Sequence, residues 1–235
     1  MKITDRANLL TIPVPEDERV YRSVPLKEIF DTLDELTIEA GWTLSKEYHQ
    51  TANKGQQHLL RFAYDTHNPL FKFEIVILNS YNKTIALKAA AGVSVAACFN
   101  GMICGEFIID RKHVGSVKED LSAFFKGFID KKDQAVADAE EMWEKFNKME
   151  ISAYFIYTVL GELFMKDCLN TQQLNLVKNE IELGVQYEGC TDKSLNLLYQ
   201  HVTFAQKNTH PLIYEKVRHT TTLIFNTHYE NFQVF

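Results

Sequence analysis

The stretch FEIVILNSYNKTIALKAAAGVSVAACFNGMICGE, residues 73–106, decides the fold of this chain. From Phe73 to Ile77 every second residue is large and apolar, which is the period of an extended strand with one buried side. A turn is expected at residues 79–82, because Asn and Ser cluster there, and a second alternating run starts at Ile85. This alternation predicts an antiparallel sheet with one face buried.

Further strands are expected on both sides of this stretch. Asn53-Lys54-Gly55 is a turn signal between two apolar-rich runs, and Asn100-Gly101 is typical of a type I′ hairpin turn. We interpret the alanines at 89–91 as close packing, because they lack the glycines and the lysine of a phosphate-binding loop. The runs that predict strands are 43–51, 57–64, 70–78, 84–88, 93–99 and 103–109.

An amphipathic helix is expected before the sheet. Ser23 is a suitable N-cap, Pro25 suits the first turn, and Gly41 suits the C-terminal end. Between them apolar residues recur every three or four positions, at Leu26, Ile29, Phe30, Leu33 and Leu36. We expect the apolar face of this helix to cover the sheet.

Helices are expected from residue 116 onward. Ser116-Val117-Lys118-Glu119 has the pattern of a capping box and predicts a long helix to about residue 149. Residues 1–22 are expected to be an irregular arm, because Pro13 and Pro15 precede an acidic run. The other predicted helices cover 152–168, 171–183, 194–206 and 211–227.

Together these patterns predict an α+β fold. It has an antiparallel sheet covered by an N-terminal amphipathic helix, followed by a mainly helical C-terminal half. We predict one domain over 1–235, made of the arm at 1–22, the helix and sheet at 23–115, and the helical half at 116–235. The only candidate boundary is a hinge near Gly115.

Composition bounds the class of protein. The chain has 235 residues, of which 46% are hydrophobic and 24% charged, so a folded globular protein is expected rather than a disordered one. The first residues lack the apolar core of a signal peptide, and no run is long enough for a membrane span. We expect the four cysteines to be reduced thiols, since none forms a Cys-x-x-Cys pair: Cys98, Cys104, Cys168 and Cys190.

Motifs for catalysis, metals and cofactors are absent from the sequence. There is no His-Glu-x-x-His, no Gly-x-Ser-x-Gly, no P-loop and no GxGxxG. The eight histidines do not have metal-ligand spacing, and Cys98 is expected to be buried. We therefore expect no catalytic residues, no metal site and no cofactor, and predict that the protein is not an enzyme.

Charge is distributed unevenly along the chain, whose formal net charge is −6. Residues 41–118 carry nine Lys/Arg against five Asp/Glu, whereas the segments on both sides are acidic. A local positive face can bind a polyanion even when the whole chain is acidic. The alternative is an ordinary solvated sheet face, where Lys and Arg are expected in any case.

The candidate nucleic-acid-binding residues follow from this charge map. We expect Arg61, Lys72 and Lys88 on the polar face of the sheet, and Lys83, Arg111 and Lys112 at nearby turns or strand ends. All six would contact phosphates. Tyr81 and Phe99 would stack on bases if their rings are exposed.

Three segments resemble a known family. Ile77-Leu78-Asn79-Ser80-Tyr81-Asn82, Val95-Ala96-Ala97-Cys98-Phe99-Asn100-Gly101-Met102 and Ser194-Leu195-Asn196-Leu197-Leu198-Tyr199-Gln200-His201-Val202-Thr203 are similar to motifs of the domain-of-unknown-function family 932 of phages and plasmids. The chain departs from them at Lys83, where Gly is usual, at Phe99, where Ser or Thr is usual, and at Gln200-His201, which replace Asn-Ala. The resemblance implies a mobile-element setting in the cytoplasm of a host cell, and no catalytic residues.

A second similarity lies in the order of elements. A helix ending at Gly41-Trp42 and followed by a strand meander resembles Rad52-type single-strand annealing proteins, which bind single-stranded DNA in a basic groove and form rings. We therefore predict a homo-oligomer that binds single-stranded DNA in replication or recombination and has no membrane partner. The alternative is a module that binds a host or phage protein, such as an inhibitor of a host defence system.

Overall fold

The computed structural model describes residues 2–95, 104–117, 119–209 and 211–232, and gives the backbone alone for residues 104–109, 208, 211, 212 and 215. The chain divides into two compact units. The first unit comprises Met1–Gly92 and Gly105–Gln134, and the second comprises Val93–Cys104 and Ala135–Phe235. The single domain expected over 1–235 stays a prediction.

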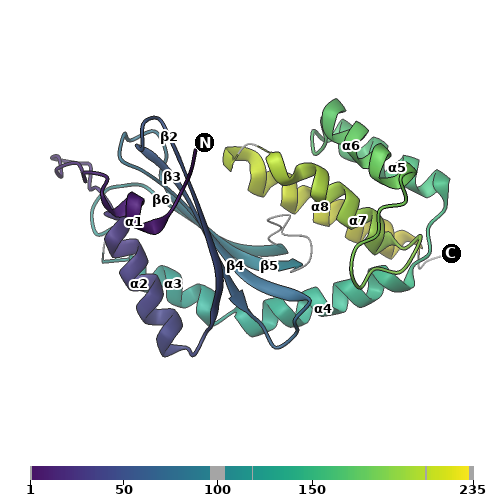
Figure 1. The fold of residues 1–235 in the computed structure, drawn as a ribbon, viewed down its shortest axis with the longest axis horizontal. Coiled ribbons are helices and arrows are strands. Elements are labelled where there is room, and N and C mark those ends of the chain that lie inside the picture. Colours follow the sequence, from purple (N-terminus) through teal and green to yellow (C-terminus); the bar gives the residue numbers. More distant parts are fainter. Residues whose placement is uncertain (1, 96–103, 118, 210, 233–235) are drawn as a thin grey trace. The chain divides into compact units, whose positions relative to one another are not determined.

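A six-stranded sheet forms the centre of the N-terminal half (Figure 1). Each strand lies beside its neighbour in sequence, in the order β1-β2-β3-β4-β5-β6, and the pairs β1–β2, β2–β3 and β3–β4 are antiparallel. The predicted α+β class with an antiparallel sheet is confirmed. The strands are β1 (Lys2–Thr4), β2 (Leu44–Ala52), β3 (Gln57–Asp65), β4 (Phe71–Ser80), β5 (Leu87–Val95) and β6 (Cys104–Arg111).

The strand predictions need one correction within this sheet. The runs expected at 84–88 and 93–99 are not two strands, because β5 continues through the alanines at 89–91. Small side chains do not interrupt a strand when its backbone is paired on both edges, as in β5 between β4 and β6. The Asn100–Gly101 turn lies outside the described residues.

The central strands bury both of their faces. On one face Phe62 is opposite Ile75, and Tyr64 is opposite Phe73, all almost completely buried. On the other face Leu59 is opposite Leu78, and both join a second small apolar cluster with Ile85. The expectation of a single buried face was therefore wrong, because apolar residues also lie on the face expected to be polar.

Helix α2 (Leu26–Glu39) contributes its apolar stripe to the first face. Phe30 lies edge-on to Phe62 of β3, with ring centroids 5.9 Å apart, and near His49 of β2 at 5.4 Å. The helix begins three residues after Ser23, with Pro25 at the N-cap, and Gly41 follows its end with a positive φ of 71°. Gly suits that left-handed conformation because it has no Cβ.

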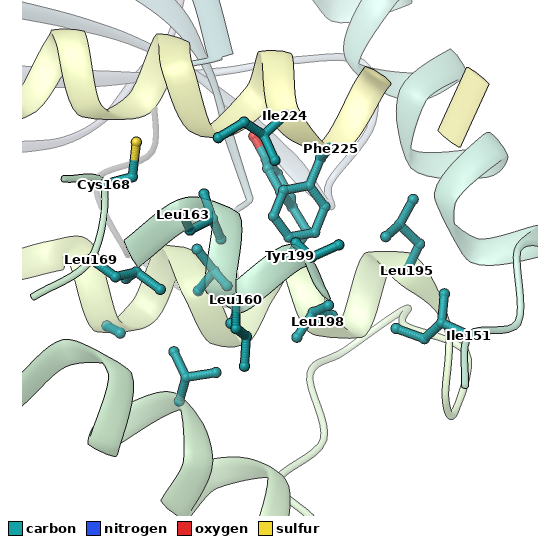
Figure 2. Close-up of a cluster of buried hydrophobic side chains, with 14 of the residues drawn as sticks. Ile151, Leu160, Leu163, Cys168, Leu169, Leu195, Leu198, Tyr199, Ile224 and Phe225 are labelled. Atoms are coloured by element: carbon teal, nitrogen blue, oxygen red, sulfur yellow. The ribbon is translucent and has the colours of Figure 1, made fainter. Parts of the chain in front are cut away.

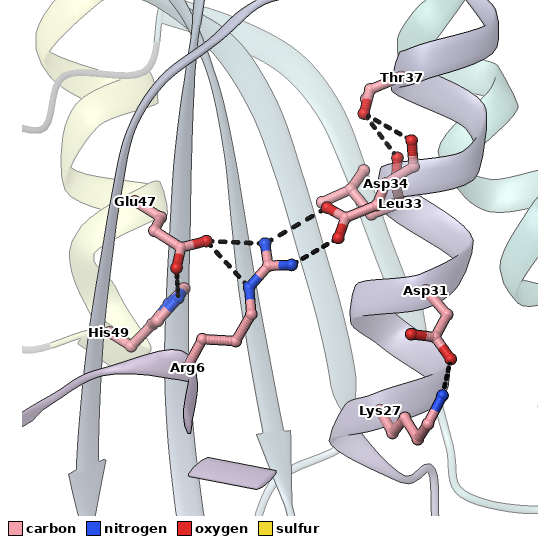
Figure 3. A network of polar contacts seen from close by, with 8 residues as sticks. All are labelled: Arg6, Lys27, Asp31, Leu33, Asp34, Thr37, Glu47 and His49. Atoms are coloured by element: carbon pink, nitrogen blue, oxygen red, sulfur yellow. Dashed lines mark hydrogen bonds and ion pairs between the residues drawn. The ribbon is translucent and has the colours of Figure 1, made fainter. Parts of the chain in front are cut away.

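The N-terminal arm is irregular over residues 12–22, as expected, but its first part is structured, contrary to the expectation. It contains β1 and the short helix α1 (Arg6–Leu10), which Asp5 caps by accepting a hydrogen bond from the Asn8 backbone N–H at 2.7 Å. Arg6 joins this arm to the rest of the unit, because its guanidinium contacts Asp34 of α2 at 2.5 Å and Glu47 of β2 at 2.7 Å (Figure 3). The same group lies 4.4 Å from the centre of the Phe30 ring.

The long helix expected from the capping box at residue 116 is two helices. Helix α3 (Leu121–Ile129) begins after Asp120, and α4 (Lys132–Lys148) follows after a break. The hydroxyl of Ser116 donates to the Asp120 carboxylate at 3.2 Å, so it does not cap a helix. At the start of α4, the Lys132 amine donates to the Asp65 carbonyl at 2.9 Å and lies 4.3 Å from the centre of the Trp42 ring.

The second unit is mainly helical. Ser152 and Ser194 cap the helices that follow them, and Asn170 forms a capping box with Gln173. These local signals explain why the helix positions expected from the sequence agree with the structure. The helices are α5 (Ala153–Met165), α6 (Thr171–Glu182), α7 (Leu195–Ala205), a 3₁₀ turn at Gln206–Asn208, and α8 (Pro211–Phe232).

Aromatic and aliphatic side chains form the core of the second unit (Figure 2). Tyr199 of α7 and Phe225 of α8 meet edge to face with centroids 4.8 Å apart, and Phe146 of α4 contacts both rings. Val159 and Leu163 of α5 complete this core and have no exposed surface. Across the described ranges, no helix combines the length and the apolar character that crossing a membrane requires.

Candidate nucleic-acid interface

A basic pocket lies in the first unit, where three segments distant in sequence meet. Its walls come from residues 18–21, from residues 83, 85 and 86 after β4, and from residues 112–114 after β6. We name it by its three cations, Arg19, Lys83 and Lys112. The cavity has a volume of about 470 Å³, within the range of sites that hold small ligands or one unit of a polymer.

Hydrogen bonds to backbone groups hold these segments together. The Arg22 N–H donates to the His113 carbonyl at 2.8 Å, and a ring nitrogen of His113 lies 3.2 Å from the Arg22 carbonyl. The Tyr21 hydroxyl donates to the Ser80 carbonyl at the end of β4, at 2.8 Å. The pocket is therefore formed by the fold and not by a single flexible loop.

The turn after β4 places Lys83 at the pocket. Ser80 closes this turn, since its hydroxyl donates to the Ile85 carbonyl at 2.8 Å and accepts from the Ile85 N–H at 3.1 Å. Lys83 itself has a φ of 64°, a left-handed conformation that costs a residue with a Cβ about 1 kcal/mol or more relative to Gly. The chain thus keeps a lysine at a position where glycine would be less strained.

The charges at the pocket are mostly positive. Arg19, Lys83 and Lys112 are exposed, and among the lining residues that the structure describes Glu18 is the only acid. The Lys83 amine contacts the Glu18 carboxylate at 2.5 Å and lies 5.3 Å from the centre of the Tyr21 ring. Exposed ion pairs contribute little stability, so Lys83 can exchange Glu18 for a phosphate at small cost.

His113 and Tyr21 form the partly buried wall of the pocket. Their ring centroids are 5.2 Å apart. Burial lowers the pKa of His113, although the backbone carbonyls of Arg22 and Ile85 oppose this effect, so the imidazole is neutral at neutral pH. Burial likewise raises the pKa of the Tyr21 hydroxyl. The positive charge of the pocket therefore comes from the three exposed cations.

Three other predicted phosphate contacts lie away from the pocket and are each paired with a carboxylate. Lys72 contacts Asp65 at 2.5 Å, Lys88 contacts Asp110 at 2.7 Å, and Arg111 contacts Asp120 at 2.8 Å. Arg61 is half-buried in β3, opposite Val76 of β4. Of the six predicted cations, the structure brings only Lys83 and Lys112 together at one cavity.

The predicted stacking residues need a correction. The Tyr81 side chain is only 3% exposed, its hydroxyl accepts a hydrogen bond from the Leu26 backbone N–H at 2.9 Å, and its ring lies 4.7 Å from that of His58. A ring buried in this way offers no face to a base, so Tyr81 is removed from the candidate site. Phe99 lies outside the described residues.

Two residues of the pocket were missed by the sequence reasoning. Arg19 and Tyr21 lie in the arm, within the segment 1–40 whose net charge of −4 gave no indication of a basic site, although Arg19 and Arg22 flank Tyr21. The short sequence Arg19-Val20-Tyr21-Arg22 was the available signal. This short sequence indicates a binding site only once the fold places it beside the turn at Lys83.

A second cavity, of about 350 Å³, lies in the second unit and has mostly apolar walls. His201 contributes to its wall and contacts Glu180 at 2.9 Å, and the Tyr187 hydroxyl donates to the same carboxylate oxygen at 2.8 Å. Ser194 is also on the wall, but its hydroxyl caps α7 by accepting from the Leu197 N–H. The imidazole therefore has an orienting partner, and Ser194, which carries the one hydroxyl among the described lining residues, serves as a helix cap.

No group of three His, Cys, Asp or Glu side chains that could hold a metal ion occurs among the residues that the structure describes. In the comparisons with known proteins, no curated protein and no solved structure matches the chain. One family model does match, over residues 18–233, which is nearly the whole sequence. The matched region includes the pocket and most of the second unit. The chain therefore belongs to the family described as Domain of unknown function (DUF932).

Proposed function

We propose that this chain binds single-stranded DNA at the basic pocket, without catalysis, in the replication or recombination of a phage or other mobile element. The observation that carries the proposal is the convergence of Arg19, Lys83 and Lys112 on one cavity from three separate segments. Cations on different segments are held apart by the fold, so they can contact successive phosphates of one strand. We expect the protein to act in the cytoplasm of a host cell.

The shape of the pocket favours a single strand over a duplex. A cavity of about 470 Å³ is concave and partly lined by the Tyr21 and His113 rings. A single strand can place one unstacked nucleotide into such a cavity, whereas the bases of a duplex are paired and stacked inside the helix. The phosphates on both sides of that nucleotide would contact the cations.

The backbone at Lys83 supports a role for its amine. A left-handed backbone conformation is strained for a residue with a Cβ, as at Lys83. Residues with such strain are concentrated at functional sites, where the side chain is needed. Replacing Lys83 by glycine removes the charge and also the strain. We therefore expect Lys83→Gly to weaken DNA binding and to increase the free energy of unfolding.

The test is fluorescence anisotropy with a labelled oligothymidylate of roughly 20 nucleotides at two salt concentrations. Three phosphate contacts predict that affinity falls about 20-fold when salt rises fourfold, because the slope is about −0.7 per contact on a single strand. Lys83→Gly, Arg19→Ala and Lys112→Ala should each weaken binding and make the slope shallower. An unlabelled duplex should compete less well than the unlabelled single strand.

The matched control is Lys54→Gly. Lys54 is also an exposed lysine with a left-handed φ, 57°, in the turn between β2 and β3, and it does not line the pocket. Its replacement removes the same charge and relieves the same kind of strain. The proposal is wrong if the wild-type chain shows no salt-dependent affinity, or if Lys54→Gly weakens binding as much as Lys83→Gly.

A further inference from the structure

Helix α5 of the second unit exposes large apolar side chains to solvent. Tyr154 is 81% exposed, Tyr157 71%, Phe164 42% and Met165 79%. The opposite side of the helix is already buried, since Val159 and Leu163 lie in the core of the unit. The exposed residues are therefore a second apolar face, beyond what the fold itself requires.

This second face is continuous and uncharged. Its members recur at intervals of three and four residues, so they share one side of the helix. They are Ala153, Tyr154, Tyr157, Thr158, Gly161, Phe164 and Met165, and all are exposed. A solvated helix face normally carries charges, as α4 does with its Glu141–Lys145 and Glu144–Lys148 pairs. Aromatic residues and methionine without charges are instead typical of the centre of a protein interface.

The area of this face matches the needs of a small dimer. An aromatic side chain can bury about 150–250 Å², so the four large side chains expose on the order of 500 Å² together. Two copies of the face would remove on the order of 1,000 Å² from water, which is the lower limit for a specific interface. Monomeric proteins rarely expose more than a few hundred Å² of contiguous apolar surface.

We propose that this face, which we call the α5 face, is the contact between two copies of the chain. An antiparallel pair of α5 helices related by a two-fold axis at Gly161 places Tyr157 of each copy opposite Met165 of its partner. Methionine sulfur and aromatic rings make favourable contacts, and the two-fold axis produces this contact twice. A Cβ added at Gly161 would have no neighbour within 4 Å, so the space above this residue is open to a second helix.

The test is sedimentation velocity of the chain over roughly 1–100 µM, without nucleic acid, so that it is independent of the proposed function. The wild-type chain should show a concentration-dependent dimer. Tyr157→Glu places a charge at the centre of the α5 face and should raise the dimer dissociation constant at least ~30-fold, as expected for an interface hot spot. Gly161→Leu should do the same, because it holds the helices apart.

Two features of this experiment distinguish a variant that cannot dimerise from a variant that cannot fold. Leucine is a better helix former than glycine, so Gly161→Leu should leave the folded chain at least as stable, as checked by circular dichroism. Leu183→Glu is the control, since Leu183 is 80% exposed at the end of α6 and is not part of the α5 face. The proposal is overturned if the wild-type chain stays monomeric, if either α5 variant dimerises normally, or if Leu183→Glu is equally disruptive.

Discussion

Both units bury histidines, but the surroundings of these side chains differ between the two units. In the first unit, burial lowers the pKa of His58 to about 4, and it also lowers the pKa of His49 and His113. In the second unit the buried His201 has a carboxylate partner, Glu180, at 2.9 Å. The comparison teaches where each unit can be tested: the first through its histidines with lowered pKa, and the second through the packed rings of Phe146, Tyr199 and Phe225.

The largest effect expected from this comparison is loss of volume in the second unit. Phe225→Ala removes a fully buried ring that contacts Phe146 and Tyr199, and should lower the free energy of unfolding by about 3–5 kcal/mol in urea titrations. Phe232→Ala on the same helix is the control and should cost less than about 1 kcal/mol, because Phe232 is half exposed.

Hydrogen exchange would sharpen this result. We expect Phe225→Ala to accelerate exchange of α7 amides more than exchange of β3 amides. Equal acceleration in both elements would show that the two units unfold together as one domain.

The next effect concerns pH and the first unit. The pKa of His58 is about 4 in the folded chain, so the unfolded chain binds a proton at a higher pH than the folded chain does. The free energy of unfolding is therefore highest above pH ~6.5 and decreases as the pH falls toward 4. His58 alone predicts a loss of about 2–3 kcal/mol between pH 7.5 and 4.5. Urea unfolding at both pH values should show a smaller loss in His58→Gln than in wild type.

His219→Gln is the matched control for this pH experiment. His219 is exposed on α8, so its replacement should leave the pH dependence of wild type unchanged. A pH dependence that is unaffected by His58→Gln would show that other groups dominate the acid sensitivity. His49 and His113 would then be the next residues to replace, because burial lowers their pKa values in the same direction.

The smallest of the three effects concerns the ionic link of the arm. Arg6→Leu removes charged hydrogen bonds to Asp34 and Glu47 and should lower the free energy of unfolding by about 2 kcal/mol (Figure 3). Lys27→Leu removes an exposed pair with Asp31 on the same helix α2 and should change it by less than about 0.5 kcal/mol. Equal effects would mean that the Arg6 link contributes no more than a surface pair.

Local signals made much of the fold predictable. Ser152 and Ser194 cap their helices within three residues, and the alternation from Phe73 to Ile77 is contained in β4. The first part of the arm was not predictable, because α1 has five residues, too few for an apolar period, and β1 forms only by pairing with β2. The break before α4 was also hidden, since helix-forming residues continue through it.

The candidate site was less predictable, because its contacts join residues far apart. A charge count over residues 41–118 included Lys83 and Arg111, but their partners Glu18 and Asp120 lie outside that window. Tyr81 was expected at a turn, where it would stack on a base if its ring were exposed, yet its hydroxyl accepts from the backbone of Leu26, 55 positions away. Sequence patterns indicate which side chains share a face of one element, but not which acid lies beside which base.

The order of strands in the sheet has a consequence for how the chain folds during synthesis. Since each strand pairs with the one made just before it, every hairpin from β2 onward can close as soon as its second strand leaves the ribosome. Such short loop closures cost little chain entropy, so the meander should form quickly for a β-rich structure. The pocket requires Lys112 and His113, and it is therefore completed only when the last strand has been added.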